Sequence, residues 1–303
     1  MTHDFYISSS NHRDFHGCGD HCIYLRNGLT KAGFSAALTN QIVLRKNTIS
    51  IFFEFFNIAQ AEQLIELHKK RDLRFIIVAT ELITGNTFNN FEEESKADYG
   101  RAKDWKERFD AFSMLVPYAE AIWCLSTHQI DSYSAAFPLA QCDVIPLCFD
   151  PIEAISSAEI KPTKDISASF FGTVTKYREQ VLETIETPVF YPGSWAPKPI
   201  LIDCIKRSKI SLHLNLTEKW PYTSNFRHHT LICNHGLCVS EKSVYPGELD
   251  EHIILFERAD LNEGIKELLQ RPDLGDLAEK QQKSYAANGC ISTEMKALID
   301  RLS

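Results

Sequence analysis

The chain contains 303 residues, of which 44% are hydrophobic and 24% are charged, as in an ordinary globular protein. Its formal net charge of −8 argues against general nucleic-acid binding, although it leaves room for a local basic pocket. The segment 1–15 lacks the apolar region of a signal peptide, and no apolar run reaches the ~18 residues of a membrane span. We therefore expect a cytoplasmic protein, with peripheral membrane contact left open.

Nine cysteines are scattered along the sequence without a CxxC pair, which favours free thiols in a reducing compartment. One cluster combines residue types that bind metals: His16, Cys18, Asp20, His21 and Cys22. Its spacing matches no standard zinc site, so we expect no metal there.

The first half of the chain alternates between strand-like and helix-like segments. Strands are predicted over 4–10, 34–38, 48–56, 75–80, 121–125 and 142–147. Helices are predicted over 21–33, 59–71, 105–118 and 127–137, where the apolar spacing is helical. The polar, acidic segment 84–104 is predicted to be a long loop. This alternation is typical of a parallel sheet covered by helices.

Residues 150–165 interrupt the pattern with two prolines and several acids, and we place a domain boundary there. The predicted domains are residues 1–150 and residues 151–303, and the second domain ends in a helical tail. Strands are predicted in the second domain over 167–171, 188–191, 210–216, 237–240 and 253–256. Helices are predicted over 175–185, 198–207, 226–235, 261–270, 273–287 and 291–302.

The predicted fold class is therefore α/β, with two Rossmann-like parallel-sheet domains. Ligands of open parallel sheets bind at the carboxyl ends of the strands. We accordingly expect the two domains to face a central cleft that holds the site.

A first candidate anion site lies where the strand 167–171 turns into a helix. Gly172 and Thr173 form the turn, and Lys176 and Arg178 follow on the helix. Glycine permits close approach, and cations beside a helix N-terminus favour an anion, so we predict a diphosphate cradle. The alternative is a plain turn beside a solvated basic face.

A second group of cations begins the helix 226–235. Arg227, His228 and His229 are predicted to contact phosphate or sugar, because an arginine fork binds phosphate with two hydrogen bonds. The alternative for a histidine is a core position. Glu241 and Lys242 follow a short strand and either contact the ligand or form an exposed charged loop.

Other residues are candidates for the nucleobase pocket. Tyr191, Gly193, Ser194 and Trp195 form one turn, and Asn215 follows the strand-like SLHL. Trp195 is read as packing more readily than as stacking on a base.

Catalytic candidates lie in the first domain. His16 and Asp20 flank a Gly-Cys-Gly turn, and Glu81 ends the strand 75–80. These residue types can take a proton from a substrate hydroxyl group when their pKa is tuned. Asp20 as a helix N-cap and Glu81 as a solvated carboxylate are the alternatives.

Four segments of the second half carry a resemblance to a known family: SFFGTVTKYREQVL, FYPGSW, SKISLHLNL and NFRHHTLICNHGLCVSEK. They resemble the C-terminal domain of the spore-maturation-type glycosyltransferases, a group of nucleotide-sugar transferases of the GT-B fold. The first half is similar more loosely, through HGCGDHCIYLRNGLTKAGFSAAL and CDVIPLCFD. Arg227 matches the arginine of the family, and Thr230 stands where the family commonly has a glutamate that touches the donor.

The resemblance implies a metal-independent enzyme without cofactor that moves a sugar from a nucleotide-sugar to a glycan, a lipid-linked sugar or a small molecule. The absence of a DxD motif agrees with metal independence. Thr230 keeps two alternatives open. One is a catalytically idle GT-B-like binding or partner subunit, and the other is a nucleotide-sugar epimerase of the same fold.

Overall fold

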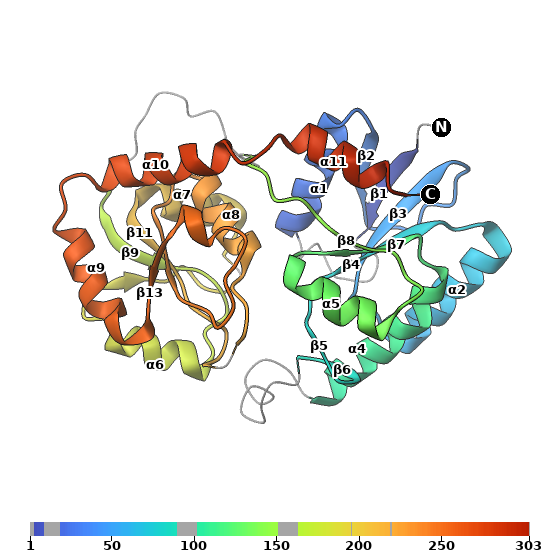
Figure 1. Cartoon of the computed structure of the whole chain (residues 1–303), viewed down its shortest axis with the longest axis horizontal. Helices are drawn as coiled ribbons and strands as arrows, with labels where there is room; N and C mark the ends of the chain where they lie inside the picture. Colours follow the sequence, from blue (N-terminus) through green and yellow to red (C-terminus); the bar gives the residue numbers. More distant parts are fainter. Residues whose placement is uncertain are drawn as a thin grey trace. The chain divides into compact units, whose positions relative to one another are not determined.

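The computed structural model describes residues 3–8, 19–89, 102–150, 163–194, 196–218 and 220–302. It divides the chain into two compact units, each a sheet with helices on its faces (Figure 1). Unit 1 comprises Met1–Pro146 and Cys290–Ser303, and unit 2 comprises Leu147–Gly289. The expected division differs from this one at the C-terminal tail, which groups with unit 1.

The sheet of unit 1 has six parallel strands in the order β2-β1-β3-β4-β7-β8. Their bounds are β1 Asp4–Ser8, β2 Ser35–Thr39, β3 Thr48–Phe53, β4 Phe75–Ala79, β7 Ala121–Cys124 and β8 Cys142–Val144. Strands β3 and β4 are buried along their whole length, because helices cover both faces of the sheet. The parallel sheet predicted from the alternation is confirmed.

The predicted loop 84–104 is partly structured. Strands β5 (Ile83–Thr84) and β6 (Thr87–Phe88) form an antiparallel hairpin, and α4 begins at Ala102. Gly85 takes a φ of +64° in the turn, a conformation that glycine adopts without steric cost. The polar composition of the segment hid this hairpin, because each strand is only two residues long.

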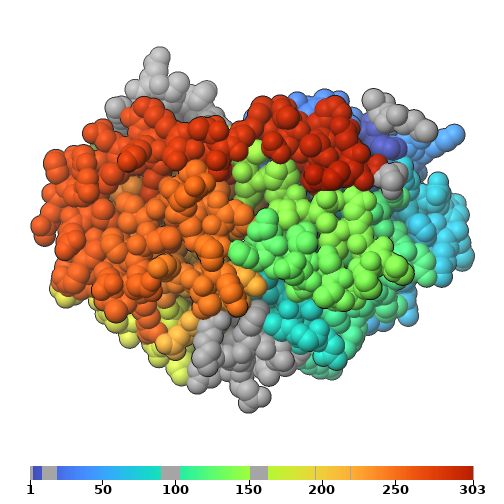
Figure 2. Space-filling model, viewed as in Figure 1, coloured from blue at the N-terminus to red at the C-terminus, as the bar shows by residue number. Residues whose placement is uncertain are grey.

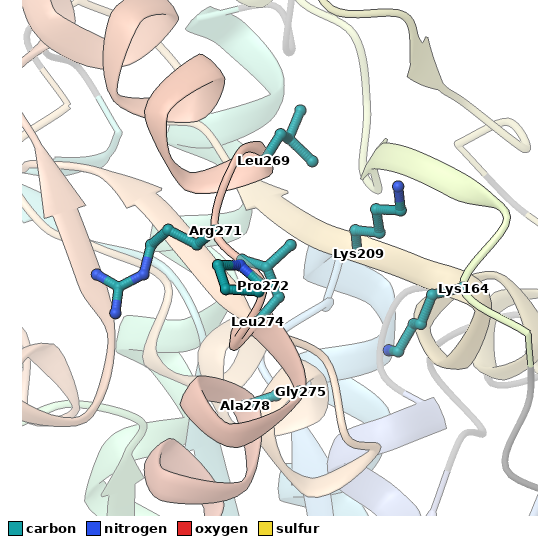
Figure 3. Close-up of a pocket in the computed structure, with 8 residues that line it drawn as sticks. All are labelled: Lys164, Lys209, Leu269, Arg271, Pro272, Leu274, Gly275 and Ala278. Atoms are coloured by element: carbon teal, nitrogen blue, oxygen red, sulfur yellow. The ribbon is translucent and has the colours of Figure 1, made fainter.

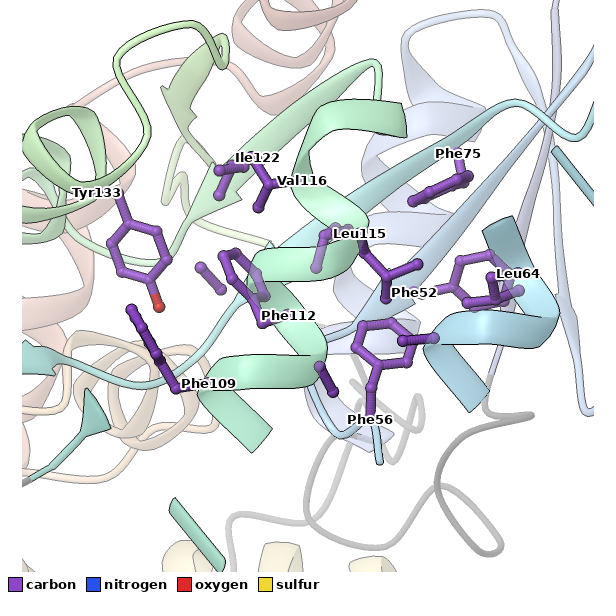
Figure 4. Packing of buried hydrophobic residues seen from close by; sticks show 14 of the residues in the cluster. Phe52, Phe56, Leu64, Phe75, Phe109, Phe112, Leu115, Val116, Ile122 and Tyr133 are labelled. Atoms are coloured by element: carbon purple, nitrogen blue, oxygen red, sulfur yellow. The ribbon is translucent and has the colours of Figure 1, made fainter. Parts of the chain in front are cut away.

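The helices of unit 1 enclose an aromatic core (Figure 4). They are α1 Gly19–Lys31, α2 Ile58–Arg71, α4 Ala102–Leu115, α5 Thr127–Ala136 and the 3-10 turn η2 Val116–Tyr118. Helix α2 starts with a capping box, in which the Asn57 side chain accepts from the Gln60 backbone amide and the Gln60 side chain accepts from the Asn57 backbone amide. Phe52, Phe75 and Phe112 are fully buried between the sheet and these helices.

Unit 2 has five parallel strands in the order β10-β9-β11-β12-β13. The strands are β9 Ile166–Phe170, β10 Val189–Phe190, β11 Ser208–His213, β12 Cys238–Glu241 and β13 Ile254–Phe256. The helices are α6 Lys176–Thr184, α7 Lys198–Arg207, α8 Asn225–Cys233, α9 Leu261–Leu269 and α10 Leu274–Ala286, with 3-10 turns η3 Asp250–His252 and η4 Arg258–Asp260. The second predicted Rossmann-like sheet is thereby confirmed.

Each sheet has a point where the strand order reverses. In unit 1 it lies between β1 and β3, and in unit 2 between β9 and β11. The loops that leave neighbouring strands at such a point run in opposite directions, and the opening between them is where open parallel sheets bind ligands. The carboxyl ends of the strands at these two reversal points are therefore the places where a ligand site is expected.

The last helix, α11 (Ile291–Ile299), packs on α1 of unit 1, on whose surface Figure 2 shows it in dark red. Gly28 makes room for it, since a Cβ there would lie 2.7 Å from Met295 Cε. An ion pair of 2.8 Å between Arg301 and Asp143 ties down the residues that follow. None of the helices within the described ranges is long and apolar enough to cross a membrane.

Replacement of Met295 by Ala tests this packing. The side chain is fully buried, so Met295→Ala should lower the free energy of unfolding by about 2–5 kcal/mol, as measured by urea denaturation. The neighbouring Lys296 forms only an exposed ion pair with Asp300, and Lys296→Ala should change this free energy by less than about 1 kcal/mol. Equal effects of the two substitutions would contradict the packing of α11.

Candidate functional site

Arg178 binds together the two loops at the strand-order reversal of unit 2. It lies in the first turn of α6 and is buried. Its Nη1 donates to the Thr173 carbonyl at 2.8 Å, its Nη2 to Leu214 at 2.7 Å and its Nε to Asn215 at 3.0 Å. Thr173 follows β9, whereas Leu214 and Asn215 follow β11, so one guanidinium group fixes both loops.

A second arginine reaches the same place. Gly172 has a φ of +131°, which favours glycine, and a Cβ there would lie 3.4 Å from Arg178 Nη1 and 3.7 Å from Arg227 Nη2. Arg227 belongs to the first turn of α8. Two guanidinium groups from different helices therefore converge beside the Gly172 α-carbon. Such forks beside a helix N-terminus suit a phosphate group.

His229 occupies the core, as the alternative from the sequence has it. It is fully buried, and its Nδ1 lies 2.7 Å from the Tyr285 hydroxyl. Its edge also contacts Cys233 at 3.7 Å. The side chain therefore packs against α10.

His228 is also fully buried, and its hydrogen bonds define its tautomer. The Ser240 hydroxyl donates to the Glu241 carbonyl at 2.9 Å, so its lone pairs must accept from His213 Nδ1 at 3.0 Å and from His228 Nε2 at 3.2 Å. His228 Nδ1 is then an unprotonated acceptor, and it is buried without a hydrogen-bond partner.

His228 and His213 are both neutral at physiological pH. Burial, with a smaller effect of the Arg227 charge, lowers the pKa of His228 to about 3. Burial also lowers the pKa of His213 well below its ordinary value, assisted by His228, Arg178 and Arg227. The positive charge beside Gly172 therefore comes from the arginines and not from the histidines.

Glu241 and Asn215 connect the carboxyl ends of β12 and β11. The buried Glu241 carboxylate accepts from the Tyr177 hydroxyl and, at 3.0 Å, from the Asn215 amide. Burial, and then Glu241, raise the pKa of Tyr177. The Asn215 side chain donates to the Lys242 carbonyl at 3.2 Å, while Lys242 Nζ pairs with Glu257 at 2.8 Å on the surface.

Tyr191, another predicted residue of unit 2, contacts the Gly172 turn. The Tyr191 hydroxyl donates to the Gly172 carbonyl at 3.0 Å and lies 2.6 Å from Ser194 Oγ. Gly193 has a φ of +108° and no heavy atom within 4 Å of a built Cβ, so its surroundings are open. Lys176 is exposed at the start of α6, and Trp195 lies outside the described residues.

Thr230 is turned back on its own helix. Its hydroxyl donates to the Phe226 carbonyl at 3.0 Å, and the residue is buried. The position at which relatives of the resembled family carry a glutamate therefore holds a short, satisfied side chain.

Unit 1 carries a buried charge cluster at the carboxyl ends of β3 and β4. Arg108 Nη2 donates to Glu81 Oε1 at 3.0 Å and also to Glu54 Oε1. Sequence reasoning found Glu81 but missed Glu54 and Arg108. The available signal was the single carboxylate in the apolar run TISIFFEFF.

The other two catalytic candidates are less informative. Asp20 lies in the first turn of α1, where the helix dipole favours a carboxylate. His16 and Cys18 lie outside the described residues. Among residues 3–8, 19–89, 102–150, 163–194, 196–218 and 220–302, no group of three or more His, Cys, Asp or Glu side chains could hold a metal ion.

A cavity of about 220 Å³ lies elsewhere in unit 2, lined by Lys164, Lys209, Leu269, Arg271, Pro272, Leu274, Gly275 and Ala278. It sits near the amino end of β11, because Lys164 Nζ donates to the Ser208 carbonyl at 2.8 Å. Figure 3 shows its three cationic side chains pointing in different directions. They do not converge on one point as the two arginines beside Gly172 do.

Arg178 can be tested by a conservative substitution. Arg178→Lys keeps the charge, but its donors all lie on one nitrogen and cannot span carbonyls that three separate nitrogens of Arg178 reach, so the free energy of unfolding should fall by about 2–4 kcal/mol in urea denaturation. Arg207 forms a similar fork with Asp165 on the surface of the same unit, and Arg207→Lys should cost less than about 1 kcal/mol. If Arg178→Lys costs no more than Arg207→Lys, Arg178 does not hold the two loops together.

The buried histidine makes unit 2 sensitive to acid. Between pH 6.5 and about 3 the unfolded chain binds a proton at residue 228 that the folded chain excludes, so stability falls as the pH is lowered. His228→Gln keeps a donor but does not titrate. Its free energy of unfolding should fall less steeply below pH 6, by about 1.4 kcal/mol per pH unit. Parallel curves for the two proteins would mean that His228 is not held neutral.

Comparison with known proteins places the fold. No protein-family model matches the chain, and no characterised protein matches it in sequence. Among solved structures it is similar to the T4 phage BGT in complex with UDP and Mn2+, with a TM-score of 0.60, 12% identity and coverage of 99% of both chains. It is also similar to a DNA-modifying beta-glucosyltransferase, with a TM-score of 0.58, 10% identity and coverage of 100% of this chain and 99% of that one.

A third similar structure is the UDP-forming alpha,alpha-trehalose-phosphate synthase of Burkholderia xenovorans in complex with glucose-6-phosphate. Its TM-score is 0.54 at 10% identity, with coverage of 92% of this chain and 77% of that one. At such identities the likeness concerns the fold alone. The chain has a GT-B-like fold with two Rossmann-like parallel-sheet units.

Proposed function

We propose that this chain is a glycosyltransferase that uses a nucleotide-sugar as donor and holds its diphosphate beside Gly172. The observation that carries the proposal is the convergence of Arg178 Nη1 and Arg227 Nη2 at the glycine, at the strand-order reversal of unit 2. The glucosyltransferase and synthase folds named above support it, since one of these proteins was solved with UDP and another with uridine diphosphoglucose.

The charges suit the chemistry of such a transfer. Negative charge develops on the diphosphate as the sugar leaves, and fixed arginines with a helix N-terminus stabilise it without reorganisation. We propose that these groups, assisted by Lys176 and the Thr173 backbone, make a metal ion unnecessary. Tyr191 and Gly193 would border the nucleoside, while Asn215, Glu241 and Lys242 keep the edge in place.

We propose Glu81 as the group that takes the proton of the acceptor. The acceptor O–H bond breaks toward the carboxylate, the oxygen forms the new bond to the anomeric carbon, and the bond from that carbon to the diphosphate breaks with its electron pair. Glu81 supports this role because it is held at the carboxyl end of β4 and is 7% exposed. The acceptor would be a glycan, a lipid-linked sugar or a small molecule.

Nucleotide binding tests the proposal. The diphosphates of uridine, guanosine, cytidine and adenosine are each added to the intact chain with EDTA, and the melting temperature is measured. One of them at 100 times its Kd should stabilise the protein by about 2.7 kcal/mol. Gly172→Ala should abolish this shift, because the new methyl group enters the space between the two guanidinium groups.

Gly33→Ala is the matched control. Gly33 also has a positive φ, of +91°, but nothing lies within 4 Å of its built Cβ, so Gly33→Ala strains a left-handed backbone position without blocking the arginines. Retention of the shift in Gly33→Ala and its loss in Gly172→Ala is the expected pair of results. The proposal fails if no diphosphate shifts the wild type, or if Gly172→Ala binds normally.

A further inference from the structure

Two carboxylates of unit 1 share one donor nitrogen. Arg108 Nη2 donates to Oε1 of Glu81 at 3.0 Å and to Oε1 of Glu54. The guanidinium group is sandwiched near aromatic rings, 4.6 Å from the centroids of both Phe55 and Trp105. Because Glu54 is fully buried and Glu81 and Arg108 are largely buried, the charges of the cluster act on one another with little screening.

Glu54 is bound as an anion on all sides. It is fully buried, and Oε2 accepts from the backbone amides of Thr80 at 2.5 Å and Glu81 at 2.8 Å. Oε1 accepts from the Thr80 hydroxyl at 2.8 Å as well as from Arg108. A proton on Glu54 must therefore displace one of these donors, and Arg108 is the one that has a second carboxylate to pair with.

Glu81, in contrast, is held in position by uncharged partners as well as by Arg108. The Asn89 amide donates to Oε2 at 2.6 Å, and the backbone carbonyl accepts from Gln129 at 2.9 Å and Tyr133 at 2.9 Å. What can change at Glu81 is how much of the Arg108 charge it receives.

The charge balance leaves the cluster one positive charge short. The charged or titratable groups that face Glu54 from the described elements are Arg108 on α4, Glu81 after β4, Cys124 on β7 and Tyr133 on α5. Burial raises the pKa of both Cys124 and Tyr133, so these two are neutral. Burial lowers the pKa of Arg108, but Glu81 and Glu54 outweigh it and the net change is upward.

Glu54 is the member of the cluster that titrates near neutrality. Burial raises its pKa to about 7, against the opposing effect of Arg108 and with a further increase from Glu81. The cluster thus gains or loses a proton within the physiological range.

We propose that Glu54 is a positioning residue for Glu81: its ionisation, transmitted through the shared guanidinium group, sets how readily Glu81 accepts a proton. This rests on the proposed function, in which Glu81 takes the proton of the acceptor. Ionised Glu54 draws on Arg108 and repels the Glu81 charge, which makes Glu81 the stronger base. Protonated Glu54 leaves Arg108 to Glu81 alone, which makes it the weaker base.

The coupling is measurable without a substrate. The chain is labelled with ¹³C at the glutamate side-chain carboxyl groups, and their NMR signals are followed from pH 5 to 9, with Glu81→Gln identifying the Glu81 signal. In the wild type the Glu54 signal should titrate near pH 7, and the Glu81 signal should change over the same pH range because it responds to the charge of Glu54. In Glu54→Gln the Glu81 signal should not move near pH 7.

Two further variants complete the test. Arg108→Lys replaces the shared guanidinium group by an ammonium group and should displace the common midpoint by about 0.5 pH units or more. Glu120 precedes β7 and pairs with Arg74, which precedes β4, through two bonds of 2.8 and 3.0 Å at the amino ends of these strands. As a control, Glu120→Gln should leave the titration curve unchanged.

The outcomes separate this inference from the proposed function. A Glu81 signal that is static near pH 7 in the wild type, or that moves identically in Glu54→Gln or Arg108→Lys, overturns the coupling even if nucleotides bind. Should Glu54→Gln not fold, the Arg108→Lys curve decides alone. Failure of every nucleotide to bind overturns the transferase while the coupling of the two carboxylates still stands or falls by its own titration.

Discussion

The contact on which unit 2 depends is the one between Arg178 and three backbone carbonyls. A strand-order reversal separates the loops that follow β9 and β11, and separate loops cost conformational entropy to hold in register. Arg178 joins them from the first turn of α6, and the Thr175 hydroxyl adds a bond of 2.8 Å to the Leu216 carbonyl. The same guanidinium group then forms one side of the space beside Gly172.

The carboxyl ends of the two sheets carry opposite charge. Beside Gly172 two arginines converge, and the Glu241 carboxylate is held by Tyr177 and Asn215. At the ends of β3 and β4 two carboxylates share one arginine. Arginines suit a leaving diphosphate, and carboxylates suit the removal of a proton. A transfer from a nucleotide-sugar requires both of these tasks.

Much of the fold follows from local sequence, whereas the site depends on contacts distant in the chain. Apolar runs and helical spacing predicted both parallel sheets, because each element has a strong period of its own. The meeting of Arg178 with Arg227 at Gly172, and of Arg108 with Glu54, requires the packed structure. Residue type alone also left His228 and His229 ambiguous, and burial beside Ser240 and Tyr285 assigns both to the interior. The return of α11 to unit 1 had no local signal, since Gly28 shows its purpose only against Met295.

Amide hydrogen exchange, with and without the nucleoside diphosphate that binds best, tests the central claim most directly. The account predicts slower exchange over 171–178 and 224–229, the two segments that flank the arginines, and unchanged exchange at the amino end of β11 near Lys164. Protection confined to the cavity around Lys164 and Arg271, or absent from both segments, would contradict a diphosphate site at Gly172.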